Sequence, residues 1–202
     1  TSLKSIIIPE SVKKIGDDAF LGCTSLKSII IPESVEKIGD GAFRDCTSLK
    51  SIIIPESVTE IGYEVFSGCS TLKSVIIPES VTKIQFGAFI GCTSLEKIVV
   101  AEGNPVYDSR EGCNAIIETA TNILVAGCKT TVIPNSVTEI GWNAFSNCTS
   151  LESIAIPNSV TWIGDGVFSG CTSLKNITIP ESVTKIHFGA FIGCTSLEKI
   201  VV

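Results

Sequence analysis

Cysteine is the reactive side chain that this sequence uses most regularly. Nine cysteines are present, and seven occupy one position of a repeating unit: Cys23, Cys46, Cys69, Cys92, Cys148, Cys171 and Cys194. Disulfides or a metal ladder are the two functional interpretations of such a row. Zinc sites, however, use local ligand spacings of about two to four residues, whereas these thiols come once per 23-residue unit. Because a free cysteine packs like a small apolar residue, the pattern predicts a row of buried thiols.

The other two cysteines lie in a segment that reads as a β-hairpin. Its arms are residues 113–118 and 123–128, joined by a polar turn at Thr119–Asn122. If Glu118 pairs with Ile123, the same register places Cys113 opposite Cys128, within the Cα distance that a disulfide requires. Cys128 also occupies the position that holds leucine in other units, which favours a buried thiol. Both interpretations remain open at this point.

No arrangement of side chains predicts catalysis. The single histidine, His187, has no partner nucleophile or carboxylate in the pattern, and the recurring serines such as Ser28 lack a general base. We therefore expect neither an enzyme nor a bound cofactor. The net charge of -6 and the pI near 4.9 disfavour a nucleic-acid partner. No apolar run approaches the roughly 20 residues of a membrane span, so we expect no membrane insertion within this chain.

An internal repeat of 23 residues organises the whole chain. The unit reads TSLKSIIIPESVxxIGxxAFxGC, and its leucines and prolines keep the same step except across one unit that has gained ten residues. A period in the twenties with an LxxIxI core predicts a leucine-rich-repeat solenoid, in which neighbouring units stack to bury a shared core. We expect one domain over residues 1–202, with regular repeats at 1–94 and 128–202 and the long, hairpin-containing repeat at 95–127. Residues 79–100 and 181–202 differ at one position only, which suggests a slice of a longer array.

Alternation of apolar residues assigns the faces of each unit. In the segment after Leu26, Ile29 and Ile31 point into the core and Ile30 points outward, and Pro32 ends the strand. The second half of the unit is predicted to form a short extended piece and then a brief helical turn that carries Ala42 and Phe43 inward. The fold class is therefore α/β but mainly β: a curved solenoid with nine strand positions and one inserted hairpin. The recurring phenylalanines are expected to form a stacked aromatic spine.

The outward positions of the strands are the best candidate for a binding site, because they align β-branched side chains on the concave face. At about 4.8 Å per strand, the first six positions span roughly 25 Å. Monomers rarely expose continuous apolar patches of that size without a use, although strand propensity alone or self-association are alternative explanations. The candidate residues are Ile7, Ser28, Ile30, Ser51, Ile53, Ser74, Ile76, Lys97, Val99 and Val132. The row continues through Ala155, Thr178 and Val201, and the hairpin at 113–128 is expected to protrude as a second contact.

The unit IPESVxxIGxxAFxGCTSL resembles the BspA-like leucine-rich repeats of bacterial surface proteins, and residues 103–118 resemble the inserted hairpin of that family. The resemblance implies a secreted or cell-surface adhesion module without catalytic residues. Its partners would be host extracellular-matrix proteins or other surface proteins. A passive spacer array with no ligand is the alternative. Because neither end of the sequence carries a polar cap, we also expect end-to-end self-association or flanking sequence that covers the ends.

Overall fold

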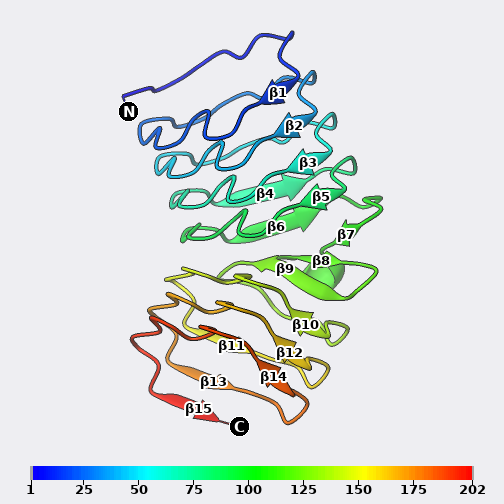
Figure 1. Ribbon diagram of the computed structural model, residues 1–202, viewed down its shortest axis with the longest axis vertical. Helices are drawn as coiled ribbons and strands as arrows, with labels where there is room; N and C mark the ends of the chain where they lie inside the picture. The colour runs from blue at the N-terminus through cyan, green and yellow to red at the C-terminus, as the bar shows by residue number, and fades with distance from the viewer. Residues whose placement is uncertain (1, 202) are drawn as a thin grey trace.

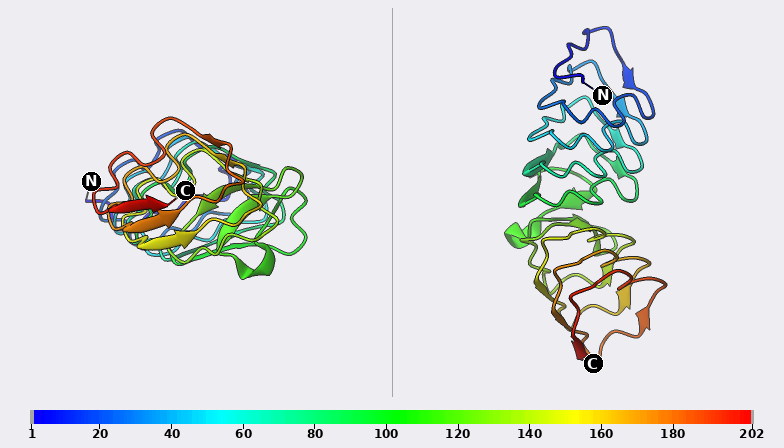
Figure 2. Two further views of the ribbon diagram at one scale, coloured as in Figure 1. Left: turned by 90° about the horizontal axis from the view of Figure 1, so that it is seen from below. Right: turned by 90° about the vertical axis from the view of Figure 1, so that its left-hand side faces the viewer.

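The structure is an elongated solenoid in which successive 23-residue units stack along one axis (Figure 1). It is a computed structural model that describes residues 2–201, so Thr1 and Val202, the ends of the predicted domain, lie outside the described residues. Viewed along the axis, the turns superimpose as a flattened outline with strands on its sides (Figure 2). This confirms the predicted leucine-rich-repeat solenoid.

One side of the solenoid, called here the first strand face, is formed by the LxxIxI segments. Its strands pair in parallel as a two-stranded and a three-stranded sheet: β4 (Ser74–Ile77) with β6 (Lys97–Val100), and β11 (Ser153–Ala155) with β13 (Asn176–Thr178) and β15 (Lys199–Val201). In the first three units the segment makes only the isolated parallel bridges Ile7–Ile30 and Ile30–Ile53. The predicted strand position around Val132 is irregular.

The second half of each unit contributes a two-residue strand to the second strand face. The parallel pairs keep a register of 23 residues, as the spacing predicts. These strands are β1 (Lys14–Ile15), β2 (Lys37–Ile38), β3 (Glu60–Ile61), β5 (Lys83–Ile84), β10 (Glu139–Ile140), β12 (Trp162–Ile163) and β14 (Lys185–Ile186).

The predicted helical turn is wrong. Each unit instead has two residues of positive φ, such as Gly41 and Asp45, separated by right-handed turn residues. This alternation turns the backbone groups toward the adjacent unit, so the N–H of Phe43 donates to the carbonyl of Val65 at 2.9 Å. A helix needs negative φ throughout and would direct those bonds within one unit. Among residues 2–201 the only helical element is the 3-10 turn η1 (Arg110–Gly112).

The phenylalanine spine is confirmed, in two segments. Ring centroids of Phe20, Phe43, Phe66 and Phe89 follow one another at 5.3–5.7 Å with nearly parallel planes. A second stack begins at Phe145 and continues at 5.5 Å spacing through Phe168 and Phe191. The buried residues divide in the same way into an N-terminal and a C-terminal core.

The inserted hairpin forms the layer between the two cores. Strands β8 (Ala115–Glu118) and β9 (Ile123–Gly127) are antiparallel, and Glu118 pairs with Ile123 as predicted. A short strand, β7 (Tyr107–Asp108), pairs with β8, and β9 pairs with β10. The hairpin therefore extends the second strand face instead of protruding, which corrects the expectation. Ile116 packs into the N-terminal core and Ile117 into the C-terminal core, so both faces of the hairpin are covered.

Gly127 lies at this junction, at a position where a side chain would clash with Phe145. An ideal Cβ on Gly127 would lie 2.2 Å from Cε1 of Phe145, whose ring is 2% exposed and starts the second spine. We expect Gly127→Ala to lower the free energy of unfolding by about 1–3 kcal/mol, because the buried ring must move to admit the methyl group. Urea denaturation measures the change, with Gly16→Ala as the control, since nothing lies within 4 Å of a Cβ there. Equal stability of the two variants would contradict the tight junction.

Candidate functional site

The predicted outward row is exposed and aligned on the first strand face. Ile7, Ile30 and Ile53 face one another through parallel bridges, and Ile76 pairs with Val99 in β4–β6. The isoleucines of this row are 62–92% exposed, whereas the alternating isoleucines that flank them, such as Ile29 and Ile31, are buried. The fold thus leaves a continuous strip of β-branched side chains in solvent.

The polar candidates run beside this strip. Ser28, Ser51, Ser74 and Lys97 are all exposed, and Ser74 lies directly opposite Lys97 in the register of β4 and β6. Val99 is only half-buried and continues the strip. The structure therefore brings nine of the ten candidate binding residues together on one surface.

Val132 continues the row beyond the hairpin, where the sheet is interrupted. Its side chain is 72% exposed, and its N–H donates to the carbonyl of Cys113 in the hairpin instead of to a neighbouring strand. Nζ of Lys129 lies 2.7 Å from Oε1 of Glu96, so an ion pair connects the segment before Val132 with the residue that precedes β6. The interruption follows from the insertion, which separates Val132 from the unit that would otherwise precede it.

Two shallow hollows lie on the first strand face, one beside Val132 and the other between the next two units. They have volumes of about 340 and 330 Å³ and share Ser153, Ile154 and Ala155 in their linings. Ala155 occupies the outward position that carries isoleucine in the N-terminal units, so its smaller side chain leaves a recess in the strip. The alternation predicts Ala155 as part of the row but not the recess, which the small side chain of alanine could have indicated.

The hairpin cysteines are free thiols in the structure, and the register that would have opposed them is wrong by one residue. A bulge between Ile116 and Ile117 pairs Ala115 with Gly127, which moves Cys113 out of line with Cys128. Both thiols are buried, and Sγ of Cys128 lies 3.4 Å from the carbonyl oxygen of Asn114. The structure thus follows the alternative in which Cys128 substitutes for a core leucine.

Five of the seven thiols in the cysteine row donate to the backbone of the spine, and the row is buried except for Cys194, which is half-buried. Sγ of Cys69 donates to the carbonyl of Phe43 at 3.1 Å, and Cys46, Cys92, Cys171 and Cys194 repeat this contact one unit apart. Burial raises the pKa of Cys46 to about 11 and that of Cys92 to about 12. Because the thiolate is the nucleophile and metal ligand, raised pKa values disfavour both roles for Cys46 and Cys92.

Comparison with family models gives the identity of the repeat. The description "BspA type Leucine rich repeat region" matches with six copies over residues 1–109 and 125–202. The chain belongs to this family. The short unmatched segment, residues 110–124, contains η1, β8 and the hairpin turn. No curated protein matches the sequence.

Solved structures of leucine-rich repeat proteins share the fold of this BspA-type array. A leucine-rich repeat protein from Eubacterium ventriosum superimposes with a TM-score of 0.65 at 24% identity, over 99% of this chain and 73% of that one. A leucine rich cell surface protein from Faecalibacterium prausnitzii gives 0.58 at 27%, over 98% and 79%. The leucine-rich repeat protein of T. pallidum gives 0.55 at 30%, also over 98% and 79%. These are repeat proteins by name, and none is named as an enzyme.

The remaining reactive groups of the BspA-type array serve local structure. His187 is half-buried: its Nε2 accepts a hydrogen bond from Nε1 of Trp162 at 2.6 Å, and its Nδ1 lies 3.5 Å from Oδ1 of Asp165. Within residues 2–201, no three histidine, cysteine or acidic side chains cluster in a way that would hold a metal ion. In the same residues, no helix has the length and apolarity needed to cross a membrane.

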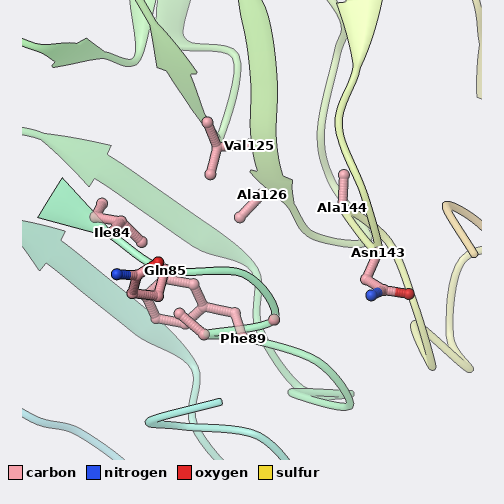
Figure 3. A pocket seen from close by; sticks show the side chains of 9 residues that line it. Ile84, Gln85, Phe89, Val125, Ala126, Asn143 and Ala144 are labelled. Atoms are coloured by element: carbon pink, nitrogen blue, oxygen red, sulfur yellow. The ribbon is translucent and has the colours of Figure 1, made fainter. Parts of the chain in front are cut away.

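The junction between the two cores contains two small cavities of about 10 Å³ each. Figure 3 shows the first, where Ile84, Gln85 and Phe89 face Val125 and Ala126 of β9 and Ala144 beyond them. A volume of that size accommodates about one water molecule. The junction between the two cores is therefore closely packed.

Proposed function

We propose that this chain is a non-catalytic protein-binding module of a secreted or cell-surface protein, and that it binds through the first strand face. The observation that supports the proposal is the strip from Ile7 to Val99, which presents aligned apolar side chains to solvent. Solenoid arrays commonly bind partners along such extended strand surfaces. A partner that covered this strip would bury β-branched surface worth about 25 cal/mol per Å².

The chemistry of the strip favours a protein partner. Apolar centres with polar margins are typical of protein interfaces, and here the serines and Lys97 form the margin of an isoleucine strip. The hollow at Ala155 could receive a larger side chain of the same partner. The class of partner that we propose, extracellular-matrix or other surface proteins, is the one that the family resemblance implies, and the F. prausnitzii structure named as a cell surface protein supports the proposed location.

Replacement of Ile30, Ile53 and Ile76 by Ser tests the proposal. We expect at least a tenfold loss of affinity for whichever matrix proteins the parent chain binds in surface plasmon resonance on immobilised collagen, fibronectin and laminin. The free energy of unfolding should fall by no more than about 1 kcal/mol per site, because only strand propensity is lost. Exposed Glu10, Glu33 and Glu56 replaced by Ser provide a matched triple control.

The outcomes separate the proposal from its alternatives. Unchanged binding by the folded isoleucine variant would show that the first strand face is not the binding site. Failure of the parent chain to bind any immobilised protein would favour the passive spacer. Light scattering at several concentrations identifies end-to-end self-association independently.

A further inference from the structure

The second strand face carries an aromatic groove that the repeat itself does not require. It is lined by Phe86, Ile123, Glu139, Trp142 and Trp162, with the backbone of Gly141, and has a volume of about 230 Å³. Phe86 and Trp142 come from units on opposite sides of the hairpin, and their ring centroids lie 4.7 Å apart. The insertion that joins the two cores thus also assembles this groove.

Equivalent positions in other units show what the fold needs at these sites. The position of Trp142 carries aspartate in three units, where the carboxylate accepts a bond from the next unit: Oδ1 of Asp40 from the N–H of Tyr63 at 2.9 Å, and Oδ1 of Asp165 from that of Phe188 at 3.0 Å. An indole cannot replace that acceptor. Tryptophan at this position therefore gives up that hydrogen bond. Aromatic side chains also occupy the position in three other units, and the rings of Tyr63, Phe86 and Trp142 follow one another at 6.1 and 4.7 Å, so Trp142 extends a short aromatic row on this face.

Both indoles are fixed although they are accessible. Trp142 is 43% exposed, and its Cδ1 lies 2.8 Å from the ideal Cβ position of Gly164, so the ring rests on that backbone with Phe86 on another side. Trp162 is held by its hydrogen bond to His187 and by an edge contact of 4.8 Å between the two rings. Rings that are already immobilised lose little conformational entropy when a ligand binds.

The charge beside the rings is negative and uncompensated. Strand register aligns Glu118, Ile123, Glu139, Trp162 and Lys185 across β8, β9, β10, β12 and β14. Among residues 2–201, Glu139 makes no ion pair and Glu118 accepts only from the hydroxyl of Thr121, while Lys185 lies beyond Trp162 at the far end of the row.

The equivalent acidic position in the N-terminal half, Glu60, provides the contrast. Its carboxylate lies 2.8 Å from Nζ of Lys37 and 3.0 Å from Nζ of Lys83. The hydrogen bond from Lys37, followed by that from Lys83, lowers the pKa of Glu60. Glu139 occupies the same place in its unit, but its neighbours in the sheet are Ile123 and Trp162. Lysines therefore neutralise Glu60, whereas among the described residues no neighbouring lysine neutralises Glu139.

We propose that the aromatic groove is a second recognition site, which takes an arginine side chain from a protein partner. A guanidinium group stacks on indole faces and pairs with a carboxylate through its planar fork, and both complements line this groove. Hydroxyl-rich ligands would find few hydrogen-bonding groups among three aromatic rings and an isoleucine. The site is independent of the first strand face and lies on the other strand face of the solenoid.

Tryptophan fluorescence tests the proposal directly, because the chain has two tryptophans and both line the groove. The folded chain is titrated with acetyl-Gly-Arg-Gly-amide at constant ionic strength, and with the matching peptides that carry citrulline or leucine. We expect saturable binding of the arginine peptide in the millimolar range and at least tenfold weaker binding of the neutral peptides. Glu139→Gln should weaken arginine binding about tenfold, whereas the matched Glu60→Gln should leave it unchanged.

Three outcomes would overturn the proposal. Absence of saturation by the arginine peptide would exclude the site, and equal binding of the citrulline or leucine peptide would assign it to neutral or apolar side chains. An arginine affinity that does not change in Glu139→Gln, with an unaltered circular dichroism spectrum, would remove the carboxylate from the site. The variant with Ile30, Ile53 and Ile76 replaced by Ser should bind the arginine peptide normally. A negative result for binding at the first strand face therefore leaves the test of the aromatic groove valid.

Discussion

Replacing Phe66 by Ala should lower the free energy of unfolding by about 3–5 kcal/mol, the range measured when large aromatic side chains are removed from protein cores. Phe66 is fully buried and stacks between Phe43 at 5.7 Å and Phe89 at 5.5 Å. Its own backbone N–H donates to the carbonyl of Ala88 at 2.8 Å, as the equivalent bonds do in neighbouring units. These bonds fix the spacing of the units, so the rings of Phe43 and Phe89 cannot move together to fill the cavity that Phe66→Ala would leave.

Phe20 is the matched control, because it belongs to the same stack but is only partly buried at the first unit. Urea denaturation followed by circular dichroism should give less than half the loss for Phe20→Ala. Equal losses at the two positions would show that the spine contributes through local turn structure instead of through stacked burial.

The stacking of the units could be predicted from the sequence because it depends on translation alone. Once Leu26, Ile29 and Phe43 recur every 23 residues, equivalent side chains must meet across adjacent turns, and the faces follow from alternation. The helical turn was predicted wrongly although the sequence contained a correcting signal. Positions 18 and 41 and their equivalents are filled mainly by Gly, Asp and Asn, which tolerate positive φ better than other residues do.

The register of the hairpin could not be obtained from the sequence. Ile116 and Ile117 are both fully buried because the hairpin has a core on each side, so no polar alternation marks where the bulge falls. The aromatic groove was missed for a different reason. Its members, Phe86, Trp142 and Trp162, come from different units, and only the stacking across the insertion brings them together. The available signal was the presence of aromatic residues at outward positions that carry charged residues in several other units.

Alkaline pH should destabilise the array strongly, because its buried thiols keep their protons only while the protein is folded. Burial raises the pKa of Cys46 to about 11 and that of Cys92, Cys148 and Cys171 to about 12, and it also raises the pKa of Cys69. In the unfolded chain a thiol has a pKa of about 8.5. The stabilisation is therefore complete below pH 8.5 and is lost as the pH rises toward 11–12.

The size of this effect follows from proton linkage. Between the unfolded and folded pKa values, each such thiol lowers the free energy of unfolding by about 1.4 kcal/mol per pH unit. With five thiols contributing, we expect unfolding well below pH 11, measured by urea denaturation at successive pH values in the presence of a reductant. In Cys69→Ala the free energy of unfolding should fall less steeply with pH, by about 1.4 kcal/mol per pH unit, because that site no longer titrates. A slope identical to that of the parent chain would mean that ionisation of lysine, and not of the buried thiols, causes the alkaline loss.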